Sequence, residues 1–312
     1  MRRAVLLVAC LCGLAGVVRP AWANLTGTVA VVSSDSTQAY ADAAQALMAE
    51  LERLGLPRQQ VSLLRPDQIG ATRQASPALY IALGLEAAAA LSRQSPAAPV
   101  LCALIPRASF EAVLAADKRR ASSQFSALYL TQPFERQLAL ARLVFPGVRR
   151  LGVLWGPQSQ GQAPALRNLT QAQGLELIEG TVTDSANLYP PLKGVLEQAQ
   201  LLLAVPDTLV FNSNTIQNIL LSALRAGVPL AGFSAGYTKA GALYSLHTTP
   251  AQVGLQAAGL AARVLGGQSL PATPVYGRDF DITVNPAVAR AFGRPLDTSA
   301  LKAELLSREK MP

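Results

Sequence analysis

Polar residues that could bind a small molecule follow an apolar run in the second half of this chain. The run LLLAV leads into Pro206, Asp207 and Thr208, and Asn212 and Asn214 follow shortly afterwards. Carboxylate, hydroxyl and amide groups are the partners that orient a small polar ligand. The same residue types also make turns and helix caps. We favour ligand contact for Asp207 and Thr208. For Asn212 and Asn214 we favour turns and caps, with one of the two capping the helix that begins near Thr215.

A second polar cluster ends the first apolar run, TVAVVSS, near the start of the chain. Ser33, Ser34, Asp35 and Ser36 stand there, directly before a helical pattern. Ser34 and Asp35 are candidates for ligand contact. The alternative is equally open, because Asp35 or Ser36 in this position is also suited to cap the helix that follows.

Further candidates end two other apolar runs. Trp155 closes RRLGVLW, and its ring could stack on a ligand or pack in the core. Ser234, Gly236 and Tyr237 follow VPLAGF, where small residues allow a ligand close to the backbone and Tyr237 offers a phenol. Ser234 is the strongest candidate of this group.

Residues for catalysis are scarce. His247 is the sole histidine, which leaves little material for a His-dependent triad or a multi-histidine metal site. Cys102 lies inside the apolar run APVLCALI, which is typical of an inert buried thiol. Glu86 and Asp184 are isolated carboxylates, and the chain has no GxxxxGK. We therefore expect no enzyme, no metal and no cofactor; an exported enzyme that uses Asp or Ser alone is the remaining alternative.

The elements that position these residues are alternating strands and helices. TVAVVSS precedes the helical pattern TQAYADAAQALMAELERLG, and QLLLAVP precedes NTIQNILLSALRAG. Repeated units with uniformly apolar strands indicate a parallel sheet covered by helices on both faces. The pattern restarts near Thr131-Gln132-Pro133, which predicts two similar α/β lobes with a cleft between them. Ligands bind beyond the carboxyl ends of strands in such sheets, where the polar clusters stand. Thr131 and Gln132 are hinge or ligand residues, and we favour the hinge.

The first residues predict export. Arg2 and Arg3 precede the apolar stretch Ala4 to Val18, and Ala21-Trp22-Ala23 has the pattern that signal peptidase cleaves. The stretch is short for a membrane span. We therefore predict a signal peptide over residues 1–23 and a periplasmic mature protein. Cys10, at the end of LVAC, is an alternative lipidation site.

Composition fits a globular protein that does not bind nucleic acid. Half of the residues are hydrophobic and 15% are charged. The net charge of +8 includes the three arginines of the leader, so the mature chain carries +5. Its basic clusters, Lys118-Arg119-Arg120 and Arg149-Arg150, lack the aromatic residues and motifs that accompany nucleic-acid binding.

The second half resembles the ABC-transporter substrate-binding proteins of the tryptophan/tyrosine type. The resemblance is carried by matched features in order: a strand ending in Pro206-Asp207, a helix, AGVP, a short strand, GAL, and a helix ending LGG. DITVNPAVARAFG follows. The match is strong over 201–285, weaker over 134–182, and limited to a shared layout in the first half.

This resemblance implies a type I periplasmic-binding-protein fold, with parallel sheets flanked by helices and a hinge between two lobes. The lobes would comprise residues 24–131 with 248–277, and 132–247 with 278–312. It also implies a monomer that captures a small molecule in the cleft and delivers it to a membrane permease. An alternative of the same fold is a periplasmic sensing module for a membrane receptor such as a histidine kinase.

The chain departs from the family pattern at two strand ends. Family members often carry Gly-Thr after the third strand, where this chain has Gly84-Leu85, and Thr-Asp-Pro after the fourth, where it has LIPRAS. Both departures remove groups that would hold the charged ends of an amino acid. Gly84 remains a candidate for ligand contact through its backbone, while the amino-acid ligand that the family implies is put in doubt.

Overall fold

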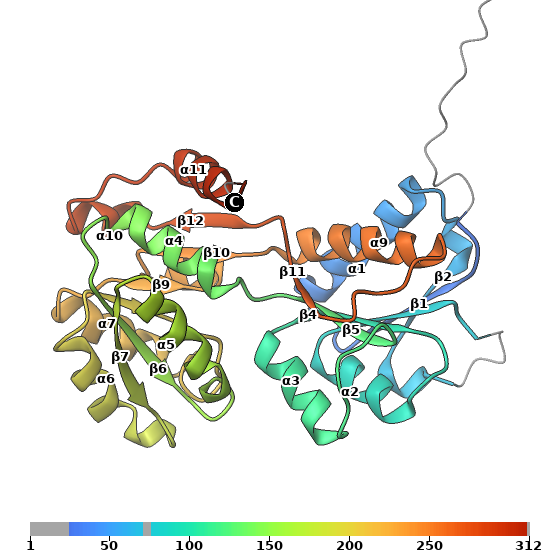
Figure 1. Ribbon diagram of the computed structural model, residues 1–312, viewed down its shortest axis with the longest axis horizontal. Helices are drawn as coiled ribbons and strands as arrows, with labels where there is room; N and C mark the ends of the chain where they lie inside the picture. Colours follow the sequence, from blue (N-terminus) through green and yellow to red (C-terminus); the bar gives the residue numbers. More distant parts are fainter. Residues whose placement is uncertain (1–24, 71–75, 311–312) are drawn as a thin grey trace, which may run out of the picture.

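The computed structural model describes residues 25–70 and 76–310. The predicted leader, with its cleavage point before Asn24 and the alternative site at Cys10, lies outside the described residues. Two α/β lobes lie side by side and are joined by three chain segments (Figure 1). The expected two-lobed fold class is confirmed. Over the described residues, no helix combines the length and apolar character needed to cross a membrane.

The first lobe is built on a six-stranded sheet with the order β11-β5-β4-β3-β1-β2, in which all neighbouring strands are parallel. Nearly every residue of β1, β3, β4 and β5 is buried, which explains their apolar sequences, since helices cover both faces. Its strands are β1 (Val29–Ser33), β2 (Val61–Leu64), β3 (Leu79–Leu83), β4 (Val100–Ile105), β5 (Phe125–Tyr129) and β11 (Val275–Tyr276).

Helices cover the two faces of this sheet in pairs. One pair, α1 and α9, shares a core cluster with Leu101 and Ala103 of β4, whereas α2 and α3 share another with Val100 and Cys102. Successive β4 residues thus enter opposite layers, as the strand period requires. Cys102 is fully buried, and burial raises the pKa of its thiol. The helices are α1 (Gln38–Arg53), α2 (Leu85–Gln94), α3 (Arg107–Ala116) and α9 (Pro250–Leu265).

The second lobe repeats this plan with the strand order β12-β10-β9-β8-β6-β7. All pairs are parallel except β10 with β12, the antiparallel edge. Its strands are β6 (Arg150–Trp155), β7 (Glu176–Thr181), β8 (Leu201–Leu203), β9 (Leu230–Gly232), β10 (Tyr244–His247) and β12 (Asp281–Val284).

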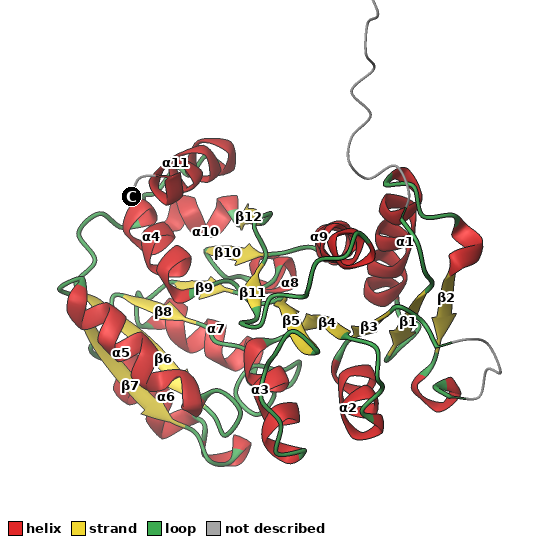
Figure 2. Ribbon diagram, turned by 45° about the vertical axis from the view of Figure 1, so that its right-hand side comes forward, coloured by secondary structure: helices red, strands yellow, loops and turns green. Residues whose placement is uncertain are grey.

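Seven helices accompany the second sheet and form two layers. The core cluster on one face includes residues of α4, α5, α10 and α11, and the cluster on the other includes residues of α6 and α7. Figure 2 shows the helices in red around the yellow strands. The seven helices are α4 (Phe134–Val144), α5 (Ala163–Ala172), α6 (Tyr189–Leu196), α7 (Ile216–Arg225), α8 (Ala235–Ala240), α10 (Pro286–Ala291) and α11 (Thr298–Lys310). Short 3-10 turns lie at Arg58–Gln60, Pro66–Gln68, Gln160–Gln162 and Ser185–Asn187.

The chain passes three times between the lobes. It leaves the first sheet after β5, returns after β10 to form α9 against α1, and leaves again between β11 and β12 (Figure 1). Thr249 starts α9 with a capping box, since its hydroxyl accepts from Gln252 N–H and the Gln252 side chain accepts from Thr249 N–H. Three separated stretches of sequence therefore form the hinge region.

Candidate functional site

A cavity of about 580 Å³ lies between the two lobes and is the principal candidate site. Its volume suits a small metabolite. The first lobe contributes Ala39, Tyr40, Leu104, Pro106, Leu130 and Thr131. The second lobe contributes Pro206, Phe233, Ser234, Ala235 and Gly236. The second crossover and the start of α9 contribute His247, Thr248, Thr249 and Pro250.

The polar groups of this cavity are neutral. They are hydroxyls of tyrosine, serine and threonine, with one imidazole, and none of its described lining residues is a lysine, arginine, aspartate or glutamate. Burial, with the charges of Asp35 and Glu86, raises the pKa of the Tyr40 hydroxyl. Tyr40 is therefore a protonated phenol at neutral pH and can donate a hydrogen bond.

Leu104 reaches the cavity through an unusual backbone conformation. Its φ of 54° lies in the left-handed region, and the pairing of β4 with β5 shifts register between Cys102 and Ile105. A leucine in this conformation costs about 1–2 kcal/mol, and such outliers cluster at functional sites. Leu104 lines the cavity and is only 7% exposed.

His247 lies at the end of β10, at the beginning of the second crossover. It lines the cavity and is 8% exposed, and its Nε2 has no hydrogen-bond partner among the described residues. Burial lowers the pKa of the imidazole, and the nearby Asp281 carboxylate opposes that effect only in part. The ring is therefore neutral at pH 7, and its Nε2 atom is itself buried.

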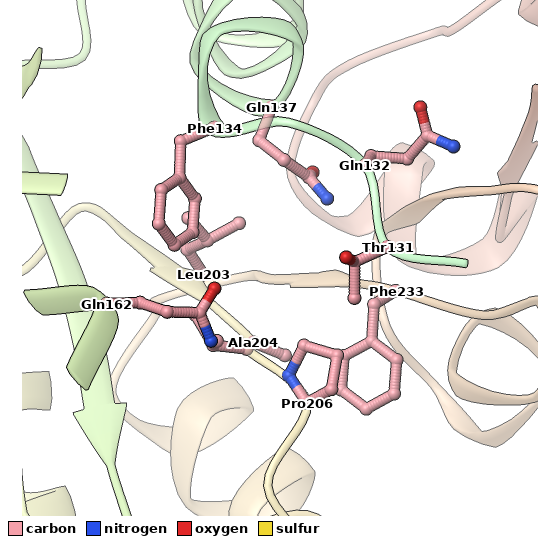
Figure 3. Close-up of a pocket in the computed structure, with 10 residues that line it drawn as sticks. Thr131, Gln132, Phe134, Gln137, Gln162, Leu203, Ala204, Pro206 and Phe233 are labelled. Atoms are coloured by element: carbon pink, nitrogen blue, oxygen red, sulfur yellow. The ribbon is translucent and has the colours of Figure 1, made fainter. Parts of the chain in front are cut away.

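A second, much smaller cavity of about 20 Å³ lies beside the first and shares Thr131, Pro206 and Phe233 with it (Figure 3). This volume admits a single water-sized probe and no metabolite. In Figure 3 the side chain of Gln132 points away from the other labelled residues. Its amide instead donates to the Thr248 hydroxyl. Gln132 thus links the first and second crossovers, which suits the hinge interpretation.

The polar cluster after β1 lines a separate groove of about 600 Å³, whose described walls come from the first lobe alone. Ser34 and Asp35 lie there, and Tyr40 borders both spaces. The Ser34 hydroxyl donates to Leu83 O and accepts from Ala87 N–H, at 2.8 and 2.9 Å. These bonds join the ends of β1 and β3 to α2. The Asp35 carboxylate accepts from the N–H groups of Ser36 and Thr37 ahead of α1.

Gly84 stands between β3 and α2 with a φ of +88°. A Cβ at this position would lie 2.6 Å from the Tyr40 hydroxyl and 2.8 Å from the Ser34 hydroxyl. Glycine is therefore required both by the backbone conformation and by the close approach of these two side chains. Gly84 does not line the interlobe cavity.

Asp207 is 3% exposed and its carboxylate is held by its own lobe. One oxygen accepts from the N–H groups of Gln158 and Ser159, at 3.0 and 2.9 Å, and from the Ser159 hydroxyl at 3.0 Å. The other oxygen accepts from Leu209 N–H. A Cβ on Gly156 would overlap this carboxylate, which explains the glycine after Trp155. Asp207 thus joins the loops after β6 and β8.

We expect Asp207→Ala to lower the free energy of unfolding by about 3 kcal/mol, because it leaves the buried N–H and hydroxyl of Ser159 and the partly buried N–H of Gln158 without their acceptor. Urea denaturation measures this loss. Asp35→Ala is the matched control, because it also removes an acceptor of two backbone N–H groups but at an exposed turn, where about 1 kcal/mol is expected. Equal unfolding midpoints for Asp207→Ala and the unmodified protein would contradict the structural role.

The remaining predicted positions have the following surroundings. Thr208 is exposed, and its N–H donates to Gln158 Oε1. Trp155 is 1% exposed, and its indole N–H donates to Glu179 at 2.6 Å, as expected for its core-packing alternative. Tyr237 packs on Phe233, with ring centroids 4.5 Å apart, and burial raises its pKa to about 12. Of the eight predicted ligand residues, Ser234 lines the interlobe cavity.

Asn212 makes side-chain hydrogen bonds just before α7, but it is not the N-cap residue of that helix. Its side-chain oxygen accepts from the N–H groups of Asn214 and Thr215, but Thr215 itself occupies the position before the first helical residue, Ile216. The expectation that Asn212 or Asn214 is the N-cap residue is therefore wrong. Asn212 instead closes a turn over residues 212–215, directly before the first helical residue.

Several cavity residues were not among the sequence candidates. Tyr40 and Phe233 follow strands whose ends were predicted to face a ligand. An aromatic residue close to such a strand end is the feature that could have identified them. Leu104 gave no signal, since its register shift and positive φ have no counterpart in the residue pattern. Thr248 stands directly after His247, at a crossover that only the fold reveals.

The buried side chain of Arg136 hydrogen-bonds to two of the crossovers and to the C-terminal helix. Arg136 of α4 donates from Nη1 to Gln132 Oε1 at 2.5 Å and to the carbonyl oxygen of Gly277 at 2.9 Å. Its Nε and Nη2 donate to the carboxylate of Glu309 in α11. The guanidinium carbon lies 4.5 Å from the centroid of the Phe280 ring. Through Gln132 and its bond to Thr248, one side chain connects all three crossovers with the C-terminal helix.

Solved structures show the same fold over nearly the whole chain. A conserved domain protein from Vibrio cholerae has a TM-score of 0.62 at 20% identity, covering 89% of this chain and 98% of that one. The ligand-free, open structure of a substrate binding protein with adhesive properties from Clostridium difficile gives 0.69 at 17% identity, with coverages of 88% and 97%.

A third solved structure is an ABC domain in complex with L-Trp from Streptococcus pneumonia. Its TM-score is 0.62 at 16% identity, covering 88% of this chain and 97% of that one. Identities this low establish the fold alone. A search of curated protein sequences gives no match.

A family model described as ABC transporter substrate binding protein matches residues 68–302, which is most of the sequence. The match spans both lobes and all three crossovers. With the two α/β lobes and the neutral cavity between them, it leads to one conclusion. The chain is a member of the ABC transporter substrate-binding protein family.

Proposed function

We propose that this protein captures a small molecule in the interlobe cavity and delivers it to an ABC import permease in the inner membrane. The observation that carries the proposal is the cavity of about 580 Å³, which is lined by both lobes and by the second crossover. A ligand that contacts both lobes favours the closed arrangement, because it gains its full contacts only when the lobes approach.

We propose that the lobes move about the three crossovers near Thr131-Gln132, Thr248 and Gly277. Ser234 is the predicted ligand residue that this arrangement supports most directly, together with Tyr40 and His247. Export to the periplasm, where the protein acts as a monomer, is part of the same proposal. N-terminal sequencing of the mature protein tests the cleavage after Ala23.

The main test is native mass spectrometry of protein purified from the periplasm without dialysis. A retained small molecule is expected as a fixed added mass. Ala235 lines the cavity, so Ala235→Trp should fill it and abolish the added mass. Ala240 is exposed at the other end of α8 and outside this cavity, so Ala240→Trp should keep it. An added mass that survives Ala235→Trp would place the bound molecule elsewhere.

A further inference from the structure

We infer that the interlobe cavity selects an uncharged molecule that carries an aromatic ring, and that it discriminates against zwitterionic amino acids. The inference rests on the proposed function, since it concerns the ligand of the same cavity. Four features of the described residues support it: the available carboxylates, two helix N-termini, the nearest arginine in the sequence and the apolar residues of the lining.

A ligand ammonium group finds no carboxylate in this cavity. Its described lining holds no aspartate or glutamate. Asp207, after the strand end that contributes Pro206, is saturated by the N–H groups of Gln158, Ser159 and Leu209 and by the Ser159 hydroxyl. A carboxylate with four donors already in place gains little from a further one. The ammonium group of an amino acid would therefore lose its water without gaining a charged partner.

A ligand carboxylate is equally poorly served at α9, the sixteen-residue helix whose start lines the cavity. Helix N-termini bind anions through free N–H groups. Here Thr249 N–H donates to the Gln252 side chain, Gln252 N–H donates to the Thr249 hydroxyl, and Pro250 has no N–H. Of the residues from Thr249 to Gln252, Ala251 alone retains a free N–H among the hydrogen bonds described.

At the start of α3, next to Pro106, the first N–H and the arginine side chain already have partners. The N–H of Arg107 points to the Thr131 hydroxyl at 3.4 Å. The guanidinium of Arg107 is engaged by Glu111 at 2.7 Å and by the Tyr276 hydroxyl at 3.1 Å. The nearest arginine in the sequence to a cavity residue of the first lobe is therefore committed to its own lobe.

The neutral lining suits a flat ring instead. Leu104 and Pro106 from the first lobe and Phe233 from the second provide apolar surface, and Tyr40 adds a second aromatic ring. The imidazole of His247 adds a further ring to this lining. Burying apolar ligand surface gains about 25 cal/mol per Å². An unpaired ion costs several kcal/mol on burial, so charge decides the selectivity.

Calorimetric titration of matched pairs tests the inference. Each pair shares a ring and differs in the zwitterionic group: indole with L-tryptophan, p-cresol with L-tyrosine, and toluene with L-phenylalanine. We expect at least one uncharged member to bind at least about tenfold more tightly than its amino acid, which corresponds to about 1.4 kcal/mol. Tighter binding of an amino acid in any pair would overturn the inference, and so would the absence of binding in all pairs.

Two variants of α1 sharpen the test. Ala39 lines the cavity, whereas Ala41 lines the neighbouring groove, and both are exposed in the first turn and a half of the helix, where aspartate is tolerated. Ala39→Asp should strengthen the binding of the cation tryptamine by about fivefold, because it supplies the missing carboxylate. Ala41→Asp should leave it unchanged. Equal effects of the two variants would contradict a cavity in which the missing carboxylate limits binding.

Failure of this inference and failure of the proposed function give different results. If the amino acids bind more tightly and Ala235→Trp removes their binding, the cavity is the ligand site but its selectivity is not as inferred. If periplasmic protein retains no small molecule and Ala235→Trp changes no binding, the proposed function itself fails.

Discussion

Gly254→Ala is expected to destabilise the protein by at least about 3 kcal/mol, although alanine is normally the better helix former. Gly254 lies in α9, where α9 crosses α1. A Cβ at this position would overlap the carbonyl oxygen of Ala43 and lie 2.9 Å from Leu47 N, and both are backbone atoms that no side-chain rotation can move. The two helices would have to separate, opening the core cluster that they share.

Gly259→Ala is the matched control for this prediction. Gly259 lies in the same helix, but a Cβ there meets no atom within 4 Å. This variant should gain about 0.5–1 kcal/mol from helix propensity alone. Urea denaturation of both variants separates the effects. If Gly254→Ala is as stable as Gly259→Ala, the close packing of α9 on α1 is wrong.

Arg136→Met is expected to lower the free energy of unfolding by about 3 kcal/mol, because it removes a buried cation from its partners. Gln132 and the carbonyl oxygen of Gly277 lose their donor, and the Glu309 carboxylate loses its cation. Methionine keeps much of the side-chain volume over Phe280, so the loss reports the polar contacts. Thermal and urea unfolding of the full chain measure it.

Arg308→Met is the control for Arg136→Met. Arg308 lies in α11 beside Glu309 and pairs with Glu304 at 3.0 Å, but both side chains of that pair are well exposed. An exposed pair of this kind contributes under about 0.5 kcal/mol. Equal losses for the two variants would show that Arg136 does not hold the hinge region as the structure indicates.

Much of the fold could be predicted from the sequence, because its strands are apolar throughout and its helices carry one apolar face. The run TVAVVSS becomes β1 and QLLLAVP contains β8, each followed by a helix as expected. The type I connectivity, with three crossovers between the lobes, was predicted from the family resemblance, because hydrophobic periodicity does not show how the two lobes are connected. The antiparallel edge strand β12 follows the third crossover.

The candidate site could be predicted only in part, because strand ends locate a site but do not show which side chains face it. Ser234 lines the interlobe cavity. Asp207 also follows the end of a strand, but its carboxylate accepts hydrogen bonds from Gln158 and Ser159 of its own lobe. Only the spatial neighbours of each group distinguish the two. Arg136 contacts Gly277 and Glu309, which are far from it in the sequence, so no local sequence pattern predicts these contacts.

The neutral lining of the cavity makes closure the decisive property of the protein. A ligand without charge is held mainly by apolar contact, which is proportional to the area removed from water. Such a ligand binds well only if both lobes cover it. The proposed ligand capture therefore requires that the lobes approach each other when a molecule is bound, and that the three crossovers bend to allow it.

The distance between spin labels at Leu85→Cys and Ser213→Cys tests this requirement most directly. The two positions are exposed, in different lobes, on the segments that follow β3 and β8, and Cys102 is buried and inert to labelling. Protein should be measured as purified with its retained molecule and again after unfolding, dialysis and refolding. We predict a shorter distance in the loaded protein. The same distance in both samples, with the bound molecule verified by native mass spectrometry, would contradict ligand capture between the lobes.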